Sequence, residues 1–122
     1  MTLREMELIA TICPAIQSNR LIRFWYENAS GSKLKEWRTV EPYIIGAYPQ
    51  RHIQLLAWLL PTHEQFMTGQ QEAWRSYTLR NISELQFLET VFSPRRDFDP
   101  KGSGMKTILC SAQKELTHLR IV

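Results

Sequence analysis

Near the amino terminus, apolar positions recur every three or four residues, which is the spacing of one face of a helix. They are Leu3, Met6, Ile9, Ala10 and Cys13. Thr2 and Glu5 have the spacing of a capping box, in which each side chain accepts a hydrogen bond from a free backbone N–H group of the first turn. We therefore predict a leading helix within residues 1–19. Pro14 either kinks this helix or begins a further turn over residues 14–18.

From residue 20 onward, apolar positions stand in short runs that are rich in aromatic and β-branched residues, which is typical of strands. The predicted strands are residues 21–26, 34–40, 43–45, 52–60, 74–79 and 85–90. Turn signals at 28–31, 48–50 and 81–83 separate these runs, and Pro42 marks a break or a sheet edge. The polar residues 62–72 are expected to form an excursion or a long loop. Several short strands with turns between them indicate a small barrel or a sandwich rather than an α/β sheet.

The carboxyl-terminal part of the chain has a weaker pattern. Residues 93–104 hold two prolines and two glycines and are typical of a tail. Residues 105–119 are ambiguous, because apolar positions fit a helical stripe while residues 107–110 alone fit a strand. Of the two, we favour the helix.

Length and composition exclude several classes of protein. A chain of 122 residues with 43% apolar and 22% charged residues is an ordinary globular domain, which argues against disorder and against a coiled coil. No signal peptide is evident, and the longest apolar run, residues 55–60, is far shorter than the roughly 20 residues that span a bilayer. We therefore expect a cytoplasmic protein without a membrane segment.

Candidate chemistry for catalysis or for metal binding is sparse. The two cysteines, Cys13 and Cys110, form no Cys-x-x-Cys pair and are expected to be idle thiols. His52, His63 and His118 stand singly, away from ligand spacing. No catalytic triad, glycine-rich phosphate loop or pair of carboxylates is evident. We expect a non-enzymatic protein that uses no metal and no cofactor.

The basic residues are unevenly chosen, and this directs attention to their positions. The net charge is only +3, but ten of the fifteen cations are arginine, whose planar fork binds phosphate and stacks on rings. Strand alternation places Arg23 beside Trp25 and Arg75 beside Tyr77. Cations next to ring faces suit single-stranded nucleic acid, but such pairs also fill the cores of small barrels. Arg95 and Arg96 precede Asp97 and are expected to lie in a solvated tail.

The order of several segments resembles the WYL domain family over roughly residues 10–100. The segments are Ala15-Ile16, Arg23-Phe24, Tyr26, Arg38 to Pro42, Ile53 to Trp58, Arg75 to Ile82, Phe92, Pro94 and Phe98-Asp99. The sequence departs from the family where Ile53-Gln54 replace the Trp-Tyr pair, and where Asn81-Ile82 replace Arg-Ile with Arg80 one place earlier. The resemblance implies a mainly β (α+β) fold, a small Sm-like or SH3-like barrel with a leading helix.

This resemblance also implies an organisation for the chain. We expect one domain over residues 1–122, with the helix in 1–19, the barrel in 20–92 and a tail or helix in 93–122. The helix-turn-helix and the extension domain that usually accompany the family have no counterpart in the sequence. We therefore expect a stand-alone protein that acts on DNA through a DNA-binding protein partner.

The resemblance further implies a bacterial effector sensor that regulates transcription, with nucleic acid or a nucleotide as the favoured ligand. The candidate ligand-binding residues are Arg23, Trp25, Tyr26, Arg38, Tyr43, Arg75, Tyr77 and Arg80. The alternative is an interaction module that docks another protein or forms a homodimer through open strand edges, without a small ligand.

Overall fold

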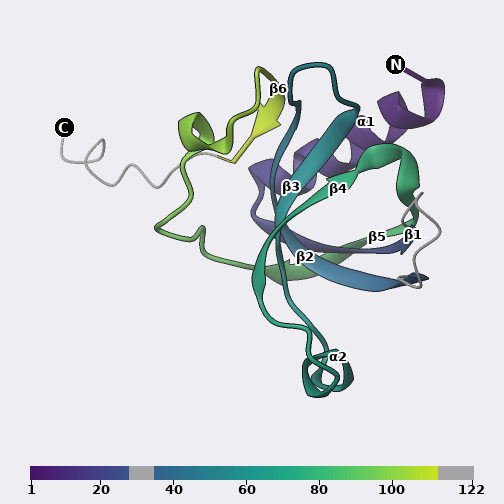
Figure 1. Ribbon diagram of the computed structural model, residues 1–122, viewed down its shortest axis with the longest axis vertical. Coiled ribbons are helices and arrows are strands. Elements are labelled where there is room, and N and C mark those ends of the chain that lie inside the picture. The colour runs from purple at the N-terminus through teal and green to yellow at the C-terminus, as the bar shows by residue number, and fades with distance from the viewer. Residues whose placement is uncertain (28–34, 113–122) are drawn as a thin grey trace.

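The computed structural model describes residues 1–27 and 35–112 of the chain. It contains one long helix, two 3-10 turns, one short helix and six strands (Figure 1). In chain order these are α1 (Leu3–Gln17), β1 (Arg20–Glu27), β2 (Lys35–Ala47), β3 (Ile53–Leu59), α2 (His63–Met67), β4 (Ala73–Thr78), η1 (Leu79–Asn81), β5 (Ile82–Val91), η2 (Pro100–Ser103) and β6 (Thr107–Ser111). The predicted mainly β architecture with a leading helix is confirmed.

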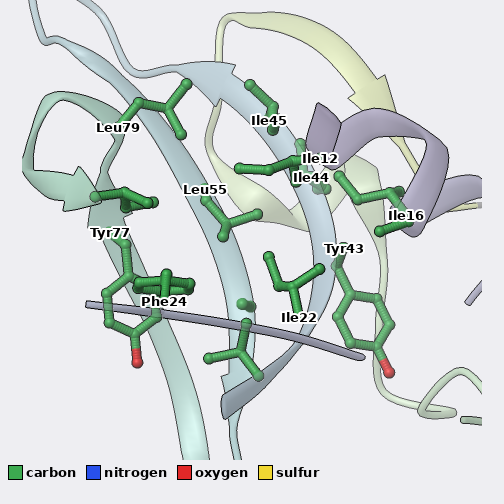
Figure 2. Close-up of a cluster of buried hydrophobic side chains, with 14 of the residues drawn as sticks. Ile12, Ile16, Ile22, Phe24, Tyr43, Ile44, Ile45, Leu55, Tyr77 and Leu79 are labelled. Atoms are coloured by element: carbon green, nitrogen blue, oxygen red, sulfur yellow. The ribbon is translucent and has the colours of Figure 1, made fainter. Parts of the chain in front are cut away.

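Helix α1 begins as the sequence indicates. The Thr2 hydroxyl accepts a hydrogen bond from the Glu5 N–H at 3.1 Å, and the Glu5 carboxylate accepts one from the Thr2 N–H at 2.9 Å. The helix continues through Pro14 and ends at Gln17, so Pro14 begins no separate turn. Its buried face, which includes Ile12 and Ile16, packs against β1 and β2 (Figure 2).

The strands form one antiparallel sheet in the order β4-β3-β2-β1-β5, with β6 paired to β2. Within the residues that the structure describes, β4 and β5 each pair on one side only, so the pairings do not close the sheet into a barrel. The sheet nevertheless curls strongly. Phe24 of β1 lies 5.2 Å from Tyr77 of β4, ring centroid to ring centroid, although two strands separate β1 from β4 in the sheet order (Figure 2).

Strand β2 is longer than expected, because Pro42 does not end it. Alternate residues of a strand direct their backbone groups to the same neighbour, and the Thr39 carbonyl accepts a hydrogen bond from Leu60 next to β3. The backbone nitrogen of Pro42 therefore faces away from β3, toward the side of β2 on which β1 and β6 pair. Pairing with β1 ends at Val40 and pairing with β6 begins at Ile44, so Pro42 lies between the two. A residue without an N–H group fits this gap, and a register shift follows it.

The polar excursion predicted over residues 62–72 contains the five-residue helix α2. Thr62 caps this helix in a second capping box with Gln65. The Gln65 side chain donates hydrogen bonds to the Glu36 carboxylate at 3.2 Å and to the Trp37 carbonyl at 3.0 Å. The excursion is therefore attached to the start of β2.

The helix favoured for residues 105–119 is wrong over residues 107–111, which form strand β6, and residues 113–122 lie outside the described part. The expectation of idle thiols is also wrong, because Cys13 and Cys110 form a disulfide. Pairing of β6 with β2 brings the two Cα atoms within 6.0 Å, although 97 residues separate them in the sequence. No local spacing could reveal this pair. Among the described helices, none has the length and apolar character needed to cross a membrane.

Candidate ligand-binding surfaces

The structure distributes the eight candidate residues over four places. Arg23 and Trp25 lie on the face of β1 that points away from Phe24. Tyr26, Arg38, Arg75 and Tyr77 lie on the side of the sheet that carries Phe24, as their register shows. Tyr43 is buried in a separate aromatic cluster, and Arg80 lies on η1. They therefore do not form one continuous site.

The outer face of β1 and β2 carries a stacked group of one cation and two indoles. Trp25 and Trp37 are register partners whose ring centroids lie 5.6 Å apart. The Arg23 guanidinium carbon lies 4.2 Å from the centroid of Trp37, and Arg23 Nη1 donates a hydrogen bond to Gln86 Oε1 at 3.3 Å. All three side chains of this outer platform (Arg23, Trp25 and Trp37) are half-buried.

The partner of Arg23 is therefore Trp37 across the strands, rather than Trp25 along its own strand. Strand alternation identified the correct face, but only the register between β1 and β2 brings Trp37 there. Among the described residues Arg23 forms no ion pair, so its charge is available to a ligand. A guanidinium without an ion pair, beside half-buried indole rings, can bind a phosphate and stack a base.

Arg38 occupies a different environment, because its charge is already neutralised. It is 6% exposed, lies opposite Phe24 in the register and forms an ion pair with Glu36. Burial alone would raise the pKa of Glu36, but hydrogen bonds from Arg38, Gln70 and Gln65 outweigh it and lower that pKa. The pair remains ionised, and Arg38 has less charge to offer an anion than Arg23 has.

The two tyrosines beside Arg38 combine packing with hydrogen-bonding capacity. Tyr26 and Tyr77 pack edge to face at 5.0 Å, and the Tyr26 hydroxyl accepts a hydrogen bond from the Thr78 N–H at 3.1 Å. The buried Tyr77 hydroxyl has no hydrogen-bond partner within residues 1–27 and 35–112. Burial raises the pKa of Tyr77 to about 12, although Arg38 and Arg75 oppose the rise. Tyr77 is therefore a neutral donor at physiological pH.

Tyr43 lies inside a polar cluster that joins the tail to the sheet. Its hydroxyl donates to Glu41 Oε1 at 3.0 Å and accepts from the Arg95 N–H at 2.9 Å. Arg95 reaches Glu41 through Nε at 3.0 Å and Nη2 at 3.2 Å, and its guanidinium carbon lies 4.0 Å from the Trp58 centroid. The expectation that Arg95 lies in a solvated tail is therefore wrong. The neighbouring Arg96 is exposed. Tyr43 itself is completely buried.

Tyr43 and Tyr77 should ionise at a higher pH than an ordinary phenol does. Burial raises the pKa of both above the usual 10.0. A group with a raised folded-state pKa stabilises the fold below its unfolded-state pKa, and this contribution disappears as pH rises through the folded-state value. We expect Tyr43 and Tyr77 to stay neutral at about pH 10, as measured by phenolate absorbance. Tyr77→Phe should remove one late-titrating group, and an unchanged phenolate titration of the folded Tyr77→Phe variant above about pH 10 would contradict the assignment.

Arg80 borders an open hollow at the start of β3. Its Nη1 atom lies 3.1 Å from His52 Nε2. The hollow has a volume of about 560 Å³ and is lined by Pro49, Gln50, Arg51, His52, Gln54 and Thr78. Gln54 stands at the position where the family resemblance expects a tyrosine. Sequence patterns gave no signal for His52, because it joins Arg80 only through the fold.

No three histidine, cysteine, aspartate or glutamate side chains gather as a metal ion requires in the part of the chain that the structure describes.

The sequence and the fold of this chain are both similar to those of known proteins. A family model described as WYL domain matches residues 7–87. Among solved structures, proteasome accessory factor B/C (PafBC) of Arthrobacter aurescens is similar with a TM-score of 0.55 and 22% sequence identity. The match covers 81% of this chain and 14% of that one, and at this identity it supports the fold alone. No curated protein matches the chain.

Proposed function

The chain belongs to the WYL domain family, and from this premise we propose that it is a non-enzymatic ligand-sensing domain that contributes to the regulation of transcription. The proposed ligand is single-stranded nucleic acid or a nucleotide. Its proposed binding site is the outer platform of Arg23, Trp25 and Trp37. The curl of the sheet, with β1 against β4, supports the small Sm-like or SH3-like barrel that the resemblance indicated.

The observation that carries this proposal is the guanidinium of Arg23 above the indole of Trp37, without an ion pair among the described residues. Single-stranded nucleic acids are bound by cations that neutralise phosphates and by aromatic side chains that stack bases. Trp25 adds a second indole beside the first. The platform therefore offers both chemistries within one patch of two neighbouring strands.

Binding is tested by fluorescence anisotropy of a labelled single-stranded oligonucleotide, titrated with protein at low and at high salt. Trp37→Ala should weaken binding by roughly 5- to 150-fold, because a stacked base contributes about 1–3 kcal/mol. Arg23→Ala should weaken it severalfold and lower its salt dependence, because a phosphate contact is lost. Other tyrosines and tryptophans are not replaced in this test, because several of them pack in or against the core.

Arg96→Ala is the matched control, because it removes the same charge from an exposed position outside the platform. It should change binding much less than Arg23→Ala does. Absence of binding at low salt contradicts the proposal. Equal effects of Arg23→Ala and Arg96→Ala would show that only net charge matters, and they would also contradict it.

One observation favours a second candidate function, a protein-docking or dimerisation module. The edge strand β5 exposes Phe87 at 40% and Val91 at 66%, and an open edge can add a strand from a partner. Light scattering at increasing protein concentration distinguishes the two functions. A mass that rises without nucleic acid supports docking, and a constant monomer mass argues against self-association.

A further inference from the structure

Strand β6 is the least buried strand of the sheet. Its first three residues, Thr107 to Leu109, are exposed, and Ile108 and Leu109 are each 42% exposed. Among the described strands it pairs with β2 alone, and a backbone hydrogen bond lies at each of its ends. These run from the Lys106 N–H to the Ala47 carbonyl at 3.0 Å and from the Ala112 N–H to the Tyr43 carbonyl at 2.7 Å. Little apolar burial therefore holds β6 in place.

The Cys13–Cys110 disulfide connects this weakly held strand to a firmly held helix. Ile12, beside Cys13, is completely buried, and α1 contacts β1, β2 and β6 (Figure 1). Both cysteines are half-buried rather than enclosed in the core. The covalent link is a second attachment that keeps β6 near β2 at a high effective concentration.

Gly46 of β2 allows β6 to approach this strand closely. A Cβ atom at Gly46 would overlap the Thr107 carbonyl and meet the Met105 sulfur at 2.8 Å, so only glycine permits the close approach. Residues 44–47 pair with β3 on one side and with β6 on the other. Departure of β6 would leave the N–H and C=O groups on that side of β2 unpaired.

We propose that the Cys13–Cys110 disulfide is a redox-controlled latch, which a dithiol reductant opens so that β6 leaves β2 while the rest of the sheet stays folded. A thiolate of the reductant attacks one sulfur of the bond and forms a mixed disulfide, releasing the other cysteine as a thiolate that takes up a proton. The second thiol of the reductant then displaces the remaining cysteine. Two electrons and two protons pass to the protein, which holds two thiols, and the reductant becomes a disulfide.

The test is hydrogen exchange followed by mass spectrometry on the oxidised protein and on the dithiol-treated protein, with thiol alkylation to count free cysteines. Reduction should speed exchange over residues 105–112 by on the order of 10²-fold, the scale on which a second attachment strengthens binding. The peptide of β3, residues 53–59, should exchange at an unchanged rate. The Cys13→Ser/Cys110→Ser variant should show fast exchange in residues 105–112 with and without the reductant.

Three results overturn the latch. The first is unchanged exchange over residues 105–112 in protein whose two thiols are shown to be free. The second is an equal acceleration of hydrogen exchange in residues 53–59, which would mean that the disulfide stabilises the whole domain rather than β6 alone. The third is a disulfide that a dithiol reduces only after the whole domain has unfolded. The reduced wild-type protein provides these readings even if the serine variant does not fold.

Discussion

Phe24→Ala is expected to lower the free energy of unfolding by about 3–5 kcal/mol, which is the range for emptying a buried aromatic site. Phe24 is completely buried, and its ring packs edge-on against Tyr77 at 5.2 Å and Tyr26 at 6.2 Å. Strand pairing alone leaves β1 and β4 apart, so the contact of Phe24 with Tyr77 helps to hold the curl of the sheet, together with the contacts of Tyr26 with Tyr77 and Thr78. Urea denaturation measures the change in the free energy of unfolding.

Two controls locate the effect of Phe24→Ala. Phe24→Leu retains most of the apolar volume and should cost less than about 1.5 kcal/mol. Trp25→Ala removes a neighbouring aromatic ring from the outer, half-buried face and should cost about 1 kcal/mol. Water that enters beside Tyr77 in Phe24→Ala should also bring the pKa of this tyrosine down from about 12 toward its usual value. A cost near that of Trp25→Ala, with no change in the titration of Tyr77, would refute the role given to this ring.

Arg95→Ala is expected to cost about 2–3 kcal/mol, at or just below the range for breaking a buried ion pair, because Arg95 is 31% exposed. The variant leaves the Glu41 carboxylate, 8% exposed, with the Tyr43 hydroxyl as its remaining donor among the described side chains. It also removes the guanidinium from the ring of Trp58. The free energy of unfolding from urea denaturation reports the loss.

Arg96→Ala is the matched control, since it removes the adjacent, exposed arginine and should stay within about 0.5 kcal/mol of the wild type. Replacing Glu41 with glutamine in the Arg95→Ala background removes the stranded charge and should recover part of the stability. Equal effects of Arg95→Ala and Arg96→Ala would mean that the cluster of Glu41, Tyr43 and Arg95 contributes nothing.

The sequence predicted the features that depend on neighbouring residues. The capping box of Thr2 and Glu5, the strand-rich order after residue 20 and the excursion near residue 62 are all present. Alternation along β1 correctly separated the face of Arg23 from that of Phe24. Each of these follows from a local backbone preference or from the two-residue period of a strand.

Long-range pairing explains what sequence patterns missed. The partner of Arg23 is Trp37 because of the register between β1 and β2, and Arg38 faces Phe24 for the same reason. Residues 105–119 fit a helical stripe, which we favoured, while residues 107–110 alone fit a strand. Pairing with β2 beyond Pro42 decides in favour of the strand over residues 107–111. As a strand, residues 107–111 pair with backbone N–H and C=O groups of β2 that a helix at this place would leave unpaired.

The sequence by itself determined the family, the mainly β composition and the capped leading helix, because these depend on local order and on recurring segments. Only the tertiary structure decided which arginines are free and which are neutralised. It separated Arg23 from the ion-paired Arg38 and Arg95, and it joined Cys13 to Cys110 across 97 residues. The physical reason is that charge compensation and disulfide formation depend on distances in space, and those distances are set by the register and curl of the whole sheet.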